Sequence, residues 1–102
     1  MASNFEALWE ECENLQKDAA ENTEVKTIID EMMMKIGLYK TVDAQISHIT
    51  EEERPKVKSR AFGEILLMLT CLSMKEQINV FESLAVALQY RKIQHLDKKN
   101  PA

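Results

Sequence analysis

One carboxylate lies within the most apolar stretch of the chain. Glu64 belongs to the run AFGEILLML at residues 61–69, whose other members are Ala, Phe, Gly, Ile, Leu and Met. A lone ionised carboxylate is almost never fully buried, because burial without a partner is costly or forces the group to take up a proton. We therefore expect Glu64 to form an ion pair, with Arg60 one helical turn away or with a lysine at the edge of the fold, or to take part in a metal or proton site.

A metal site would need further carboxylates near Glu64. Helical bundles assemble divalent-cation sites from acids that project inward from two or more helices, and Mg²⁺ prefers hard oxygen ligands. Asp30 and Glu31 are candidates because they directly follow the apolar pair Ile28 and Ile29. The helical period of about 3.6 residues places Asp30 closer to the apolar face than Glu31. The alternative is that each acid is solvated and lies near a lysine one turn away.

Other side chains give weaker signals for chemistry. Lys56, Lys58 and Arg60 form a small basic cluster, which either neutralises phosphate or lines a solvated helix face. His48 and His95 are isolated from other metal-ligating residues, so no zinc site is expected. The sequence contains no Gly-rich phosphate loop, and no Ser-His-Asp or Cys-His arrangement can be argued from it.

Four amphipathic segments would have to position these side chains. Apolar residues recur at helical spacing over residues 5–15, 25–46, 57–72 and 80–93. Three pairs have the spacing of capping boxes, namely Ser3 with Glu6, Thr50 with Glu53, and Asn79 with Glu82. Asn22 or Thr23 can cap the second segment, and Pro55 favours a third helix that starts at the proline. Gly37 indicates a kink or break in the second segment.

Length and composition indicate one all-α domain. The chain has 102 residues, 45% of them hydrophobic, with only two Gly and two Pro. We assign residues 1–97 to a single helical domain and residues 98–102 to a polar C-terminal tail. The third segment is apolar over more than one stripe, which indicates a central helix or a subunit interface. We expect a four-helix bundle that homo-oligomerisation completes.

Charge and hydropathy exclude several classes of partner. The net charge of −4 at pH 7 gives no general attraction to nucleic acid or to an anionic membrane, so neither is expected as a partner. The longest strongly apolar run, residues 65–69, is far shorter than a membrane span, and the N-terminus lacks the pattern of a signal peptide. These features predict a soluble cytoplasmic protein. Cys12 and Cys71 are expected to be buried free thiols.

Residues 60–92, RAFGEILLMLTCLSMKEQINVFESLAVALQYRK, resemble the C-terminal helix pair of the MazG-like, all-α nucleoside triphosphate pyrophosphohydrolases. In that family a helix of the form E-E-L-G-D-V-L leads into an apolar stretch, a short turn and a last helix that opens with a polar cap. Here Gly63-Glu64-Ile65-Leu66 stands for G-D-V-L, and Asn79 through Leu84 stands for the opening of the last helix.

The family's other acidic motif, E-E-x-x-E, falls on residues 30–34, where Met34 replaces the third acid. The first acid of E-x-x-D falls on Ala61, so Glu64 is the acid that remains. An alternative placement of E-E-x-x-E is Glu10 and Glu11 with Asn14 last. The resemblance implies a Mg²⁺ site made by Asp30, Glu31 and Glu64, with fewer acids than the family uses.

The resemblance also implies an activity and a substrate. It predicts Mg²⁺-dependent hydrolysis of an NTP or dNTP to the monophosphate and pyrophosphate, or nucleotide binding by a catalytically degenerate relative. The residues that would then meet the phosphates are Lys56, Lys58, Arg60 and Arg91. The alternative hypothesis is a noncatalytic helical interaction or dimerisation protein, which the incomplete acidic motifs and the broadly apolar third helix favour.

Overall fold

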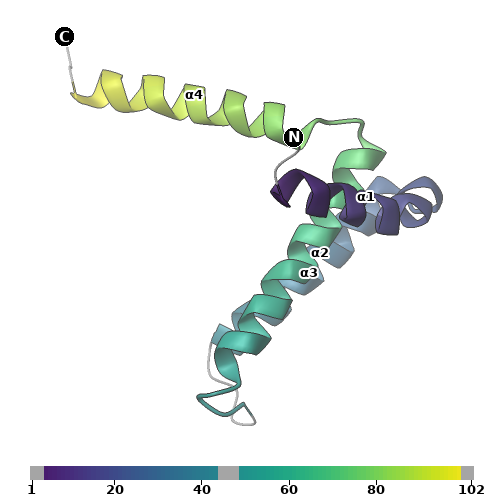
Figure 1. Ribbon diagram of the computed structural model, residues 1–102. Coiled ribbons are helices and arrows are strands. Elements are labelled where there is room, and N and C mark those ends of the chain that lie inside the picture. Colours follow the sequence, from purple (N-terminus) through teal and green to yellow (C-terminus); the bar gives the residue numbers. More distant parts are fainter. Residues whose placement is uncertain (1–3, 44–48, 100–102) are drawn as a thin grey trace.

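The chain folds into four helices, as Figure 1 shows. The computed structural model describes residues 4–43 and 49–99. Its helices are α1 (Asn4–Asn22), α2 (Val25–Asp43), α3 (Arg54–Lys75) and α4 (Val80–Lys99), and these described ranges contain no strand. The all-α class predicted from the sequence is confirmed. The last helix runs on to Lys99, two residues into the segment that we expected to be a polar tail.

The packed part of the fold consists of α1, α2 and α3. Helices α2 and α3 run side by side as an antiparallel hairpin, and α1 crosses α3 near the C-terminal end of α3 (Figure 1). Buried hydrophobic residues come from all three helices, and among the described residues they are Ala20, Ile28, Met68 and Cys71. Met32, Leu72 and Met74 pack against this small core.

One of the predicted capping pairs caps a helix, and another forms its hydrogen bond in the turn before α3, whose N-cap Glu53 has no side-chain cap. The Asn79 side-chain oxygen accepts a hydrogen bond from the Glu82 N–H at 2.9 Å and caps α4. The Thr50 hydroxyl accepts one from the Glu53 N–H at 3.1 Å, and this turn leads into α3. Helix α3 begins at Arg54, one residue before Pro55. Ser3, which we expected to cap the first helix, lies outside the described residues.

Two other expectations about helix ends were wrong in part, while Thr23 as the cap of the second helix and a kink at Gly37 stay predictions. Asn22 does not cap the second helix, because it ends α1 and its side-chain amide donates to the Asp18 carbonyl at 2.9 Å. Helix α2 does not break at Gly37 but continues through it to Asp43. A helix tolerates one glycine at a cost of about 1 kcal/mol relative to alanine, which the packing of α2 on α3 can offset.

The connection between α3 and α4 is a Schellman motif with a residue in the left-handed region. The Ile78 N–H donates to the Ser73 carbonyl at 2.8 Å, and the Gln77 N–H donates to the Met74 carbonyl at 3.2 Å. Gln77 has φ = 57°, a conformation in which glycine is usually found because a Cβ is disfavoured there. This tight connection sets the direction in which α4 leaves α3.

Helix α4 leads away from the packed helices (Figure 1). Its first turn is held by an aromatic cluster, in which the Phe81 ring lies 5.8 Å from Phe5 and 5.9 Å from Trp9 between ring centroids. Even so, residues 81–96 are all exposed, Phe81 included. One chain on its own therefore does not close the expected four-helix bundle, and completion of the bundle by a second chain stays a prediction.

The strained connection gives a test of the fold. Gln77→Gly is expected to raise the free energy of unfolding by about 1 kcal/mol, because glycine adopts the left-handed conformation without the cost of a Cβ. The gain is partly offset by the greater entropy of the unfolded chain. Urea denaturation followed by circular dichroism measures the change in the free energy of unfolding. Gln77→Ala is the control and should give no gain, because alanine keeps the Cβ; a less stable glycine variant would contradict the assignment.

Candidate functional site

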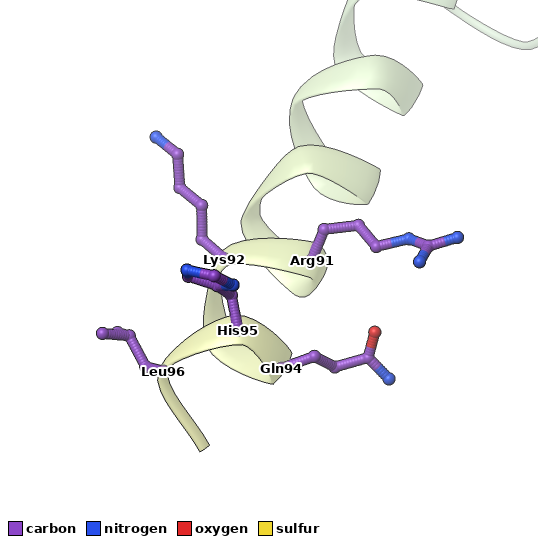
Figure 2. A pocket seen from close by; sticks show the side chains of 5 residues that line it. All are labelled: Arg91, Lys92, Gln94, His95 and Leu96. Atoms are coloured by element: carbon purple, nitrogen blue, oxygen red, sulfur yellow. The ribbon is translucent and has the colours of Figure 1, made fainter. Parts of the chain in front are cut away.

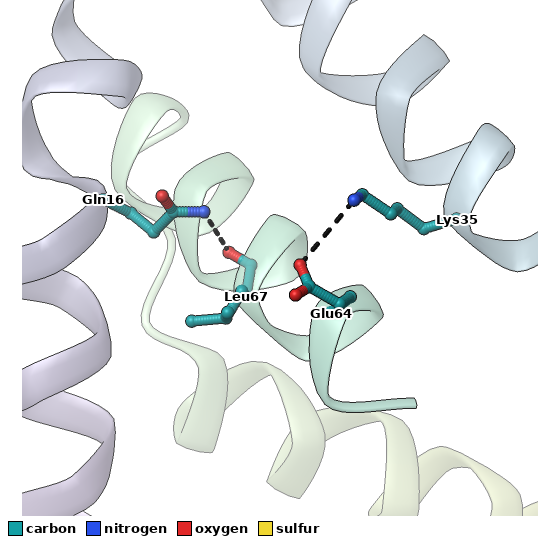
Figure 3. A network of polar contacts seen from close by, with 4 residues as sticks. All are labelled: Gln16, Lys35, Glu64 and Leu67. Atoms are coloured by element: carbon teal, nitrogen blue, oxygen red, sulfur yellow. Dashed lines mark hydrogen bonds and ion pairs between the residues drawn. The ribbon is translucent and has the colours of Figure 1, made fainter. Parts of the chain in front are cut away.

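Glu64 pairs with a lysine from the neighbouring helix. Its Oε2 lies 3.7 Å from the Lys35 Nζ, so the pair joins α3 to α2 (Figure 3). The carboxylate is partly solvated as well as paired, because the Glu64 and Lys35 side chains are 39% and 35% exposed. An ion pair of this kind contributes about 0–1 kcal/mol. The partner of Glu64 is thus an edge lysine rather than Arg60. This ion pair accounts for a carboxylate in the apolar stretch without a bound proton or metal.

The acids expected at the metal site are only partly brought together. Glu31 precedes Lys35 by one helical turn on α2, and its charge acts on Cys71 of α3. The expectation that Asp30 is the better placed acid stays a prediction, although it is Glu31 whose charge reaches Cys71. Asp30 and Glu31 are both exposed. Within residues 4–43 and 49–99, no group of three or more His, Cys, Asp or Glu residues is arranged to hold a metal ion.

Cys71 is a buried thiol between these charged groups. Its side chain is 1% exposed, and burial raises its pKa above the usual value. The negative charge of Glu31 also raises this pKa, while Lys75 lowers it. A thiol with a raised pKa stays protonated and is a poor nucleophile or metal ligand. Cys71 therefore belongs to the core, and Cys12, which is half-buried, is the more accessible of the two free cysteines.

The basic residues expected to meet phosphate are spread along the molecule. Lys56, Lys58 and Arg60 lie in the first two turns of α3, and the Lys58 Nζ lies 5.6 Å from the centre of the Tyr39 ring. Arg91 lies on α4, which extends from the opposite end of α3 (Figure 1). Arg91 and its neighbours project from α4 in several directions (Figure 2), so this stretch of a single helix does not enclose a ligand.

A different feature, an apolar groove between α1 and α3, stands out among the described residues. We call it the α1/α3 groove, and its volume is about 390 Å³. The residues that line it are Phe5, Leu8, Trp9, Cys12, Arg60, Gly63, Glu64, Leu66, Leu67 and Thr70. The Thr70 hydroxyl is fully buried and donates to the Leu66 carbonyl at 2.9 Å, so it does not call for a ligand. The lining is suited to apolar side chains rather than to a triphosphate.

A hydrogen bond holds the two walls of this groove at a fixed separation. The Gln16 side-chain amide of α1 donates to the Leu67 carbonyl of α3 at 3.1 Å (Figure 3). Gly63 lies in the α3 wall, and a Cβ added there would meet nothing within 4 Å. The α3 wall of the groove is therefore open at Gly63, which leaves room for a side chain from another helix.

Comparisons with protein-family models, with curated proteins and with solved structures found no match. The resemblance to MazG-like enzymes therefore stays a prediction that depends on the residues quoted above. None of the helices in the described part of the chain is long and apolar enough to cross a membrane.

The sequence did not reveal the α1/α3 groove. Its periodicity placed Phe5, Leu8 and Cys12 on the apolar face of the first helix, and this face was expected to be buried. In the structure Phe5 and Leu8 remain 57% and 58% exposed. The apolar stripe was a correct signal for a packing face, but the spacing of residues does not say whether the covering helix comes from the same chain.

The burial of Cys71 gives a pH-dependent prediction. In a Cys12→Ser variant, we expect Cys71 to react with a thiol reagent far more slowly in the folded protein than in urea at pH 8. The folded pKa lies above the unfolded one, so the folded state keeps its proton where the unfolded state loses it, and stability falls as the pH rises through the usual thiol pKa of 9.0. Reaction of the folded variant at the unfolded rate would contradict the assignment.

Proposed function

We propose that this chain is a noncatalytic helical interaction protein that works as a homodimer. The observation that carries the proposal is the amount of surface left exposed. The chain exposes 8458 Å², whereas a compact monomer of 11.8 kDa exposes about 5,900 Å². The difference of about 2,500 Å² per chain is what a large obligate dimer interface removes from each partner.

The shape of the chain supports the same proposal. The radius of gyration is 17.3 Å, against about 13 Å for a compact domain of this length. Most of the additional extent comes from α4, which extends from the three packed helices (Figure 1). A chain that folds to function alone does not usually hold a whole helix in solvent, because ordering it without burying its apolar side chains is unfavourable.

The chemistry of the exposed surface also favours a protein partner. Large hydrophobic side chains that are exposed in α4 and just before it are Ile78, Phe81, Leu84, Val86, Leu88, Tyr90, Ile93 and Leu96. Single exposed apolar residues are ordinary on a protein surface, but a contiguous apolar patch marks an interaction site. A helix that is apolar on more than one side is typical of a helix packed between other helices.

A second candidate function is the Mg²⁺-dependent nucleotide pyrophosphohydrolase that the resemblance implies. One observation favours it: α2 and α3 are neighbours, and Glu31 and Glu64 both lie on the faces where these helices meet. Asp30, Glu31 and Glu64 would then ligate Mg²⁺, and Lys56, Lys58, Arg60 and Arg91 would contact the phosphates of a nucleoside triphosphate. The enzymatic candidate is also compatible with a homodimer, because a single chain holds Arg91 far from the three acids and a second copy could bring its own Arg91 closer.

The proposal of a homodimer is tested by sedimentation. Analytical ultracentrifugation from micromolar to millimolar concentration is expected to give twice the chain mass of 11.8 kDa at the upper end. Leu84→Glu combined with Leu88→Glu should shift the protein to monomer, because charge on an apolar contact face must be desolvated on association. The control, Ser83→Glu, adds charge to the same helix outside that pair. A chain that remains monomeric over the whole range would overturn the proposal.

The enzymatic candidate is tested by pyrophosphate release. A panel of NTPs and dNTPs with Mg²⁺ or Mn²⁺ should give activity that Glu64→Gln abolishes, since an amide replaces a charged oxygen ligand. Glu52→Gln, in the turn before α3, is the control and should keep the activity. If the folded dimer releases no pyrophosphate from any nucleotide, the enzymatic candidate is wrong and the interaction function stands alone.

A further inference from the structure

We infer that α4 of one copy docks in the α1/α3 groove of a second copy, and that the exchange is reciprocal. The inference deepens the proposed homodimer, on which it rests, by naming the two surfaces that meet. It is carried by three properties of the described residues: the apolar stripe of α4, the open groove, and the opposite charges of α1 and α4.

The apolar stripe of α4 begins at Phe81, which already contacts residues that line the α1/α3 groove. Phe81, Leu84 and Leu88 follow each other at spacings of three and four residues and share one face of α4. Phe81 already packs against Phe5 and Trp9, and both of these line the groove. The next two members of the stripe have no such cover, since Leu84 is 66% and Leu88 is 53% exposed. The face that touches a groove residue at its first turn is therefore exposed along the turns that follow.

The chain's own α4 does not fill its own groove. From the aromatic cluster, α4 and α1 lead away from each other (Figure 1), and the Schellman motif at Gln77 fixes the departure of α4 from α3. A short and strained connection between a helix and its domain favours exchange of that helix between copies. The α4 helix of a second copy thus reaches the α1/α3 groove that the first copy's own α4 does not fill.

The length of α4 and the open space at Gly63 are suited to the docking of a helix. The α4 helix has 20 residues and a length of about 30 Å, enough to reach from one copy onto the packed helices of another. Gly63 lies in the groove wall with open space where a Cβ would be, which permits close approach of a helix. In a reciprocal exchange each chain takes part in two such contacts, once through α4 and once through its groove, so both exposed surfaces are covered.

Charge complementarity points to the same pairing. Helix α1 is acidic, with Glu6, Glu10, Glu11 and Glu13 in its first half. Towards its C-terminal end α4 carries the adjacent cations Arg91 and Lys92. Within one chain the basic end of α4 is the part farthest from α1 (Figure 1). Docking on a second copy brings it beside the acidic helix, which favours association and selects this partner.

Cys12, in the groove wall, allows a direct test by cross-linking. Leu84→Cys and Leu88→Cys place a thiol on the stripe, and Ser83→Cys and Gln94→Cys, on other faces of α4, are matched controls. A disulfide forms only when the Cα atoms come within about 4.4–6.8 Å. Under mild oxidation, at least one stripe variant should give a covalent dimer, and the controls should not. The bond should be lost when Cys12→Ser is added, which separates it from a contact between two α4 helices.

Cross-linking and sedimentation together distinguish failure of the helix exchange from failure of the homodimer. A disulfide between Cys12 and the stripe within one chain would mean that α4 folds back on its own groove, and it would overturn the exchange. Sedimentation as a dimer without any Cys12 cross-link would overturn this inference but leave the homodimer in place. A monomer by sedimentation would overturn both.

A second pair of variants tests the groove without added thiols. Gly63→Leu fills the groove, and we expect it to weaken dimerisation at least tenfold in Kd, because the new side chain occupies the space of the docked helix. Gly37→Leu is the matched control. Both positions are helical glycines with no atom near the added Cβ, so both substitutions gain the same helix propensity. Equal dimer affinity for the two variants would contradict docking at Gly63.

Discussion

The burial of apolar surface is the constraint on which the rest of this structure depends. A sequence that is 45% hydrophobic buries only a small core between α1, α2 and α3, around Ile28 and Cys71. Many of the other apolar side chains in the described part of the chain follow helical stripes and remain exposed, those of α4 above all. Hydrophobic burial is the main favourable term in folding, and the apolar surface left exposed here is the reason for proposing a second copy as its partner.

Polar interactions direct the helices rather than hold them together. Lys35 and Glu64 join α2 to α3 while both remain in contact with water, and Gln16 fixes α1 on a carbonyl of α3. Exposed ion pairs add little stability, but two specific contacts select one arrangement among the many in which apolar helices can pack. Glu64 lies in an apolar stretch because it is at the border between the hairpin and the groove, where its charge meets a cation and solvent.

The sequence predicted local structure well and tertiary structure poorly. Helix type, the cap at Asn79 and the turn at Thr50 depend on residues within one or two turns, and these predictions were confirmed. The partner of Glu64 and the course of α4 depend on contacts between distant residues, for which helical spacing carries no information. Spacing favoured Asp30 over Glu31 as the acid nearer the apolar face, and it carried no information on the effect of Glu31 on Cys71 of the neighbouring helix. Candidate residues for metal and phosphate could be named from a resemblance, but the distances between them could not.

The tight connection at Gln77 divides the assembly of this protein into two kinds of event. The hairpin of α2 and α3, with α1 across it, can form within one chain, on the fast timescale of small helical proteins. Helix α4, if it completes its packing on another copy, must wait for an encounter whose rate grows with concentration. In that case a newly made chain would pass through a stage in which a helix with exposed apolar side chains is open to chaperones and proteases. The abundance of the protein would then set not only how much of it is active but how much of it survives.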